Sequence, residues 1–92
     1  MKFIWDPKKN RLNIKLHGID FADVVDVFSY PMLSCIDNRF DYKEERWVGI
    51  GIMKGVLIVV IYTEDDEKEI IRIISARKAT KNETKSYKEK LK

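Results

Sequence analysis

The spacing of apolar residues predicts two helices in the first third of the chain, after a short strand at residues 1–5. Asp6 followed by Pro7 indicates a helix start, because the carboxylate can cap the first turn and the proline ring suits the first helical position. Gly18 is a natural stop for this helix. Its apolar positions recur at helical spacing and predict the buried face: Leu12, Leu16 and Ile19.

A second helix is expected after Asp20, which can cap it. Its apolar residues follow the i, i+3, i+4, i+7 pattern of a helix buried along one face: Phe21, Val24, Val25 and Phe28. Pro31 prevents the helix from continuing, because proline lacks the backbone donor and clashes with the preceding turn.

From residue 32 onward the period becomes two, which predicts strands at 32–36, 47–53, 56–63 and 70–76. Residues 37–45 and the acidic residues 64–69 are expected to form turns, and Lys54 and Gly55 a hairpin turn. The unbroken apolar run from 56 to 62 suits a central strand buried on both faces. The remaining residues form a weakly amphipathic C-terminal helix with four residues at helical spacing: Ala79, Glu83, Tyr87 and Leu91. The predicted fold is α+β, with an antiparallel sheet, two N-terminal helices and a C-terminal helix.

Length and composition place the chain in the class of small proteins with one core. Ninety-two residues with 45% hydrophobic content suit a single domain spanning 1–92. Cys35 is the only cysteine, so no internal disulfide can form and the cytoplasm is the expected location. The longest apolar run, seven residues, is too short to span a bilayer, and the first residues lack a signal-peptide core, so a soluble protein without membrane contact is expected.

The net charge of +3 is unevenly distributed. Residues 77–92 contain seven Lys or Arg and two Glu, a net of +5, which leaves −2 for residues 1–76. Such a basic end is either the solvated face of a helix or a contact for a polyanion.

Several kinds of catalytic site are absent from the sequence. One Cys and one His cannot form a zinc cluster, and there is neither a glycine-rich phosphate loop nor a G-x-S-x-G motif, so we expect no metal and no cofactor. The remaining His, Arg, Lys and carboxylates suit phosphate chemistry. Metal-free RNA cleavage requires a base near the 2′-hydroxyl, an acid at the leaving oxygen and fixed cations around the phosphate.

Arg72 and Arg77 are the first candidates for those cations, because arginine binds phosphate through two parallel hydrogen bonds and stays charged. Strand alternation predicts that they lie on opposite faces. The alternative is that they form ordinary ion pairs, either with the acidic turn 64–69 or with Asp23 and Asp26. His17, at the end of the first helix, suits a favourable interaction with the helix dipole or a partly buried hydrogen bond, and the residues alone favour this structural interpretation over a catalytic one.

Four segments taken together resemble the BrnT family of toxins over nearly the whole chain: residues 3–31, 44–51, 56–64 and 71–87. The most specific parts are W-D-P-x-K, N-x-x-x-H-G and R-I-I-S-A-R-x-A followed by E and Y. The resemblance implies a small α+β, RelE-like ribonuclease that cleaves RNA and arrests growth. It also implies a BrnA antitoxin, which neutralises the toxin and contacts operator DNA through a ribbon-helix-helix part.

The resemblance favours six residues for the catalytic site: His17, Glu45, Arg46, Arg72, Arg77 and Tyr87. Four lysines are expected to contact RNA: Lys15, Lys78, Lys81 and Lys85.

The chain departs from the family pattern at four polar positions. Leu16 stands where the family usually has lysine, Phe40 or Asp41 where it often has histidine, and Val56 and Asp65 where it commonly has arginine. These departures favour a second hypothesis, in which the chain is a weak or inactive member that binds RNA or antitoxin without cleavage.

Overall fold

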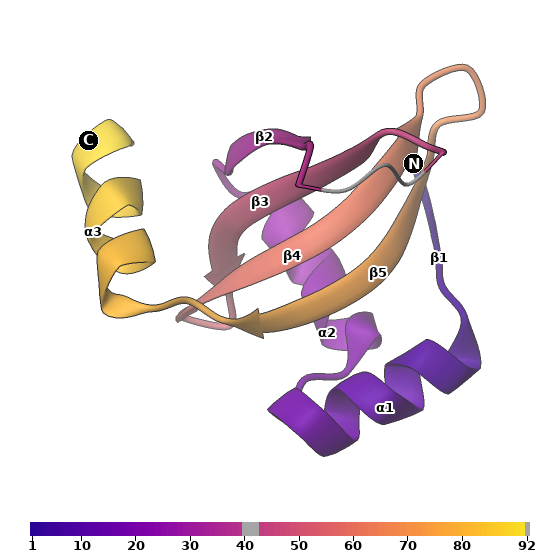
Figure 1. Ribbon diagram of the computed structural model, residues 1–92, viewed down its shortest axis with the longest axis horizontal. Helices are drawn as coiled ribbons and strands as arrows, with labels where there is room; N and C mark the ends of the chain where they lie inside the picture. Colours follow the sequence, from indigo (N-terminus) through magenta and orange to yellow (C-terminus); the bar gives the residue numbers. More distant parts are fainter. Residues whose placement is uncertain (40–42, 92) are drawn as a thin grey trace.

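Three helices and five strands follow the order expected from the sequence (Figure 1). The computed structural model describes residues 1–39 and 43–91, so part of the predicted turn at 37–45 lies outside the described residues. The strands are Lys2–Ile4 (β1), Leu33–Asp37 (β2), Arg46–Met53 (β3), Val56–Asp65 (β4) and Ile70–Lys78 (β5). The helices are Pro7–His17 (α1), Phe21–Val24 (α2) and Lys81–Lys90 (α3), with a 3₁₀ helix at Val25–Ser29 (η1). The α+β class is thereby confirmed.

The five strands form one sheet in the order β1-β5-β4-β3-β2. The pairs from β5 to β2 are antiparallel, and β4 is central, as predicted. β1, however, runs parallel to β5, from Lys2 beside Ile70 to Ile4 beside Arg72. The prediction of a wholly antiparallel sheet is therefore wrong. Apolar periodicity indicates which face of a strand is buried, but it carries no signal for the direction of a neighbour that is distant in sequence.

Helix α1 begins and ends where the sequence predicts, but it buries a different face. The Asp6 carboxylate accepts a hydrogen bond from the Lys8 amide (2.8 Å), and Gly18 ends the helix at φ 71°. Leu12 and Leu16, expected in the core, are 55% and 64% exposed, whereas Asn13 is buried. Ile19 is buried as predicted, but the prediction for Leu12 and Leu16 is wrong, because α1 turns Asn13 toward β5, where its Oδ1 accepts from the Ala76 amide.

The second predicted helix changes type halfway along its length. Asp20 caps it by accepting from the Ala22 amide (3.0 Å), as expected, but the α-helix gives way to η1 after Val24. A 3₁₀ helix has three residues per turn. Phe21 and Val24 of α2 are fully buried, and the tighter winding of η1 places Val27, three residues after Val24, in the core with them. Val25 and Phe28, which a continuous α-helix would place inside, are only partly buried.

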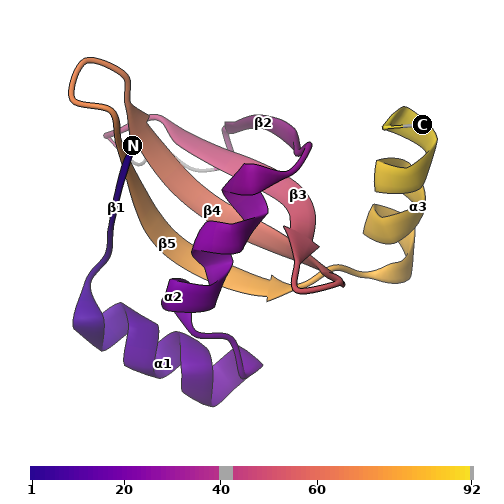
Figure 2. The ribbon, with the colours of Figure 1, turned by 180° about the vertical axis from the view of Figure 1, so that it is seen from behind.

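Helix α2 and η1 lie across one face of the sheet (Figure 2). Beneath them the core consists of side chains from β4 and β5: Ile58, Val60, Tyr62, Ile71, Ile73 and Ala76. Gly51 permits the close approach of this layer, because a Cβ there would lie 2.6 Å from Cγ1 of Val27.

No described helix covers the middle of the opposite face, which is turned toward the reader in Figure 1, while α3 stands at one end of it. We call it the open face. Cross-strand pairing assigns to it these side chains of β3, β4 and β5: Arg46, Val48, Val59, Ile61, Arg72, Ser75 and Arg77. No helix in the described part of the chain is long and apolar enough to cross a membrane.

Candidate active site

An irregularity in β5 determines which face its arginines occupy. Ser75 pairs with Ile61, but the next residue of β4, Tyr62, pairs with Ile73. Ile74 is therefore an extra residue, and the strand has a β-bulge at this point. A bulge shifts the alternation of side chains between the two faces by one position.

The bulge places Arg72 and Arg77 on the same side of the sheet. Arg72 pairs with Thr63 and Arg77 with Val59, and both partners belong to the open face. The prediction of one cation on each face is therefore wrong, because simple counting does not include the extra residue. The structure instead brings two arginines of one strand to the same exposed surface.

A pocket of about 390 Å³ lies on the open face, between the end of α1 and the first turn of α3. Its floor is apolar and comes from β3 and β4: Val48, Val59 and Ile61. Its polar lining combines an imidazole, a hydroxyl, two guanidinium groups and two carboxylates: His17, Ser75, Arg39, Arg77, Asp37 and Glu83. The pocket thus holds groups that can bind an anion and one group that can transfer a proton near neutral pH.

Arg77 is held in the pocket by Glu83. Its two terminal nitrogens donate to the two carboxylate oxygens at 2.8 and 2.9 Å. These hydrogen bonds are the main reason why the pKa of Glu83 falls to about 2. Glu83 also accepts from the Thr80 amide, which completes a capping box at the start of α3. Glu83 is therefore ionised at neutral pH and orients Arg77, and it is a poor acceptor for a proton.

A second carboxylate and guanidinium meet on another wall of the pocket. The Asp37 side chain, 1% exposed, accepts from Nε and Nη2 of Arg39 at 2.8 and 3.0 Å. Arg39 lies close enough to Arg77 for their charges to oppose each other. The pocket therefore presents two guanidinium groups, each oriented by a carboxylate.

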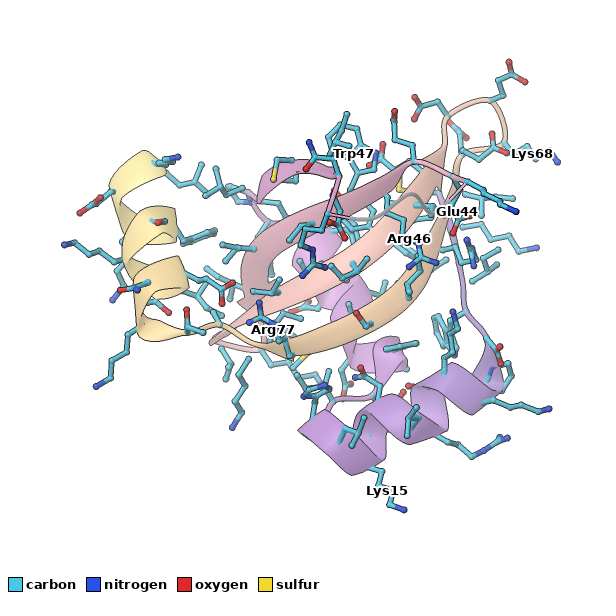
Figure 3. The ribbon with its side chains drawn as sticks, viewed as in Figure 1. Lys15, Glu44, Arg46, Trp47, Lys68 and Arg77 are labelled. Atoms are coloured by element: carbon cyan, nitrogen blue, oxygen red, sulfur yellow. The ribbon has the colours of Figure 1, made fainter. Side chains whose placement is uncertain are left out.

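A separate cluster joins the other two candidate arginines. Nη2 of Arg72 donates to both oxygens of Glu44 (2.7 and 2.5 Å), and Nε of Arg46 donates to one of them (3.2 Å). Desolvation raises the pKa of Glu44, but the hydrogen bonds and charges of the two arginines outweigh it and leave the pKa below its ordinary value. In Figure 3, Glu44 and Arg46 lie toward one end of the open face and Arg77 toward the other.

Neither ion pair expected for Arg72 is present among the described residues. Its partner is Glu44, which lies outside the acidic turn. Asp23 and Asp26 instead bind Lys54, through its Nζ (2.8 Å) and its backbone amide (3.1 Å).

The remaining candidate residues are dispersed. Glu45 is exposed just before β3. Tyr87 is buried, and its hydroxyl donates to the Pro31 carbonyl (2.9 Å), so it ties α3 to the segment before β2. Lys15 extends from α1 away from the sheet (Figure 3). The other three lysines are exposed at the end of β5 and on α3: Lys78, Lys81 and Lys85. Of the six catalytic candidates, the pocket brings together His17 and Arg77.

Five residues at or near the site were not predicted: Asn13, Asp37, Arg39, Glu44 and Glu83. The T-x-x-E spacing of residues 80–83 was an available signal for a capping box. In an extended chain the side chains of Glu44 and Arg46, two residues apart, point to the same face of the sheet and can make contact. The side chain of Glu45 points to the other face. Asn13 is the first residue of the N-x-x-x-H-G motif, but that motif does not indicate which groups the side chain contacts.

The departures from the family pattern lie mainly at exposed positions. Leu16 is 64% exposed on α1 and Val56 is 44% exposed at the start of β4. Asp65 accepts from the Lys68 amide within the acidic turn (3.1 Å). Phe40 and Asp41 lie outside the described residues.

Comparison with known proteins complements this geometry. Within residues 1–39 and 43–91, no three His, Cys, Asp or Glu side chains gather in positions that could hold a metal ion. The sequence model of a family described as "ribonuclease toxin, BrnT, of type II toxin-antitoxin system" matches residues 5–83. The matched region includes the pocket and the Glu44 cluster. No curated protein matches the chain significantly.

Proposed function

The chain belongs to the BrnT family of ribonuclease toxins of type II toxin-antitoxin systems, and on this premise we propose that it cleaves RNA on its open face without a metal ion. We further propose a single RelE-like toxin domain over residues 1–92, acting in the cytoplasm. The observation that carries the proposal is the bulge at Ile74, because it gathers both arginines of β5 on the face that also holds the pocket with His17.

In the proposed reaction the 2′-hydroxyl of one nucleotide attacks the adjacent phosphorus. The bond from the 2′-oxygen to phosphorus forms, the bond from phosphorus to the 5′-oxygen breaks, and the products carry a 2′,3′-cyclic phosphate and a 5′-hydroxyl. One group removes the proton of the 2′-hydroxyl, and one supplies a proton to the leaving oxygen. Arg77 stabilises the charge that develops on the phosphate.

His17 is the better supported of the two candidates for proton transfer. It lines the pocket together with Arg77, and an imidazole can both accept and donate a proton. Glu45 is exposed and does not line that pocket. Arg46 and Arg72 would then bind a neighbouring phosphate of the same strand, while the lysines of α3 attract RNA at a distance.

The carboxylates that hold the arginines do not prevent this role. Arg77 and Glu83 are 43% and 26% exposed, and Arg72 and Glu44 are each 36% exposed. Ion pairs of this kind contribute only about 0–1 kcal/mol, so an RNA phosphate can replace the carboxylate at a small cost. The arginines are therefore oriented before RNA arrives and remain available to it.

Incubation of the purified chain with a long RNA, with and without a metal chelator, tests the proposal. We expect equal cleavage in both conditions and products ending in a 2′,3′-cyclic phosphate, which 3′-end analysis identifies. Loss of all cleavage in chelator, or products ending in a 3′-hydroxyl, would contradict the mechanism.

The second candidate is a catalytically weak or inactive module that binds RNA or antitoxin. It is favoured by the exposed apolar residues Leu16 and Val56, at positions where a cation would otherwise face solvent. RNA binding without cleavage at any protein concentration would establish this alternative.

A toxin of a type II system has an antitoxin partner, and we propose that a BrnA-like ribbon-helix-helix protein fills this role and alone contacts operator DNA. A groove of about 550 Å³ between the β3–β4 hairpin and α3 suits its docking. Its lining includes the apolar or aromatic residues Ile52, Leu57 and Tyr87, together with the two cations Lys78 and Lys88. An acidic, amphipathic antitoxin segment matches this combination of apolar surface and positive charge.

A further inference from the structure

Asn13 is a buried polar residue between two elements of the candidate site. The residue is 5% exposed although it lies on a surface helix. Its Nδ2 donates to the Ile19 carbonyl at 2.9 Å, and its Oδ1 accepts from the Ala76 amide at 3.1 Å. One amide group thus joins the loop after α1 to β5.

The edge of β5 explains why this contact is needed. β1 pairs with residues 70–72 of β5, so the rest of that edge has no neighbouring strand in the described structure. Helix α1 packs against β5 beyond this point (Figures 1 and 2). The Ala76 amide is buried there, and a buried donor without a partner costs about 1–3 kcal/mol. Asn13 supplies the acceptor that a neighbouring strand would otherwise provide.

The two ends of the Asn13 link lie next to the two groups that the pocket brings together. Asn13 is one helical turn before His17, and the Ile19 carbonyl that it binds follows Gly18 directly. Ala76 immediately precedes Arg77. We propose that Asn13 is a positioning residue, which fixes the His17 end of α1 relative to the Arg77 segment of β5. This inference rests on the proposed ribonuclease function.

A change at Asn13 is expected to slow catalysis by altering the distance between His17 and the phosphate held by Arg77. A displacement of about 1 Å between a proton-transfer group and the reacting phosphate can lower the rate by about a hundredfold. RNA affinity comes mainly from charges elsewhere on the open face and on α3, which Asn13 does not contact. A change at Asn13 should therefore reduce kcat and leave RNA binding largely unaltered.

Asn10 offers a matched control on the same helix. Its Nδ2 donates to Asp20 (3.0 Å), and its Oδ1 accepts from the Phe21 amide (2.9 Å). Asn10 therefore resembles Asn13 in donating one hydrogen bond and accepting one. It links α1 to α2, however, and makes no hydrogen bond to β5 among the described residues.

The test compares N13A, N13D and N10A with the wild type in RNA cleavage, RNA affinity and unfolding by urea. For N13A we expect kcat to fall by about ten- to a hundredfold with RNA affinity within about twofold. In N13D a buried carboxylate oxygen would face the Ile19 carbonyl oxygen, so the loss should be at least as large as in N13A. N10A should lose stability to a similar extent and keep kcat within about threefold of wild type.

NMR of the free proteins supplies a readout that does not depend on activity. N13A, unlike N10A, should shift the Arg77 Nε–H and His17 ring signals and speed hydrogen exchange of the Ala76 amide beyond the change in global stability. Equal loss of kcat in N13A and N10A, in proportion to stability, would overturn the inference. If the wild type does not cleave RNA, the proposed function fails, and unchanged His17 and Arg77 signals in N13A would then separately refute the positioning role.

Discussion

Glu83 holds Arg77 through both of its carboxylate oxygens, at 2.8 and 2.9 Å, and at the same time caps the helix that follows β5. The guanidinium is therefore fixed both in place and in orientation before a substrate arrives. Because the carboxylate neutralises the guanidinium, the free pocket is less cationic than the sequence of the basic C-terminal region suggests.

Replacement of Arg77 tests whether this fixed cation acts on the reacting phosphate. R77A should lower RNA cleavage by about a hundredfold or more, as expected for the loss of a charge aligned with the transition state. R77K should restore only part of the rate, because lysine lacks the planar fork. Initial rates on one RNA and far-UV circular dichroism measure activity and folding. R11A, at an exposed arginine of α1, is the control, and normal cleavage or general unfolding of R77A would show that Arg77 is structural.

The low pKa of Glu83 predicts how stability depends on pH. A carboxyl group whose pKa is about 2 in the folded chain and 4.5 ordinarily stabilises the fold above pH 4.5, and this contribution disappears as the pH falls toward 2. Arg77 is partly exposed, so we expect the contribution to be on the order of 1 kcal/mol after solvent screening. E83Q keeps a residue that suits the capping box and should lack this contribution.

Urea unfolding between pH 2 and pH 7 measures the effect of E83Q. The difference in unfolding free energy between wild type and E83Q should shrink as the pH is lowered through this window. E89Q removes an exposed carboxylate of the same helix and should retain the wild-type pH dependence. A constant difference between wild type and E83Q at every pH would rule out the ionised pair as its source.

Glu44 and Glu45 are adjacent acidic residues with different surroundings, so they form a matched pair for a binding test. E44Q removes the carboxylate that competes with phosphate for Arg46 and Arg72. Because such a pair contributes about 0–1 kcal/mol, E44Q should bind RNA up to about fivefold more tightly than E45Q, which has the same net charge. Fluorescence anisotropy with a short, uncleavable RNA measures both affinities. Equal affinities would mean that Arg46 and Arg72 do not contact RNA.

E45Q, together with H17A, also tests which side chain transfers the proton. If His17 transfers the proton, E45Q should cleave RNA at the wild-type rate and H17A should not. A loss of kcat in E45Q but not in H17A would show that Glu45, and not His17, transfers the proton.

Association with the antitoxin should depend strongly on salt. The basic surface of α3 and the groove beside it attract an acidic segment, so the association rate should fall as ionic strength rises, while apolar contacts keep dissociation slow. Stopped-flow mixing of the two proteins over a salt series measures both rates. An association rate that does not change with ionic strength, or a mapped interface that leaves the groove between the β3–β4 hairpin and α3 uncovered, would show that the antitoxin binds another surface.

Local sequence signals predicted most of the elements and their ends. The caps at Asp6 and Asp20, the stop at Gly18 and the hairpin at Lys54 and Gly55 are all present, because each depends on residues within one turn of the chain. Lys54 and Gly55 both adopt positive φ values, 48° and 81°, as a tight two-residue hairpin requires. The parallel pairing of β1 with β5 could not be predicted in this way, because it joins opposite ends of the chain.

The candidate site was predicted only in part, for a related physical reason. Side-chain chemistry and the family resemblance point to Arg77 and His17, and the pocket contains both. The partners that orient the arginines, Glu44 and Glu83, depend on tertiary contacts that spacing alone does not specify. Counting alternate residues along β5 also placed Arg72 on the wrong face relative to Arg77, because a bulge adds one residue without a recognisable glycine or proline.

The bulge at Ile74 also limits which changes of length this gene can tolerate. A deletion of one codon between residues 72 and 77 would remove the bulge and restore regular alternation of side chains along β5. The Arg77 side chain would then point into the apolar layer beneath α2, where burial of an unpaired charge would destabilise the fold. The predicted turn 64–69 is shorter in the structure, because Glu64 and Asp65 belong to β4, and an insertion of one codon into residues 66–69 would lengthen a loop and leave the register of β4 and β5 intact. We therefore expect natural variation in length among relatives of this chain to occur in the turn, while the interval between the two arginines stays constant.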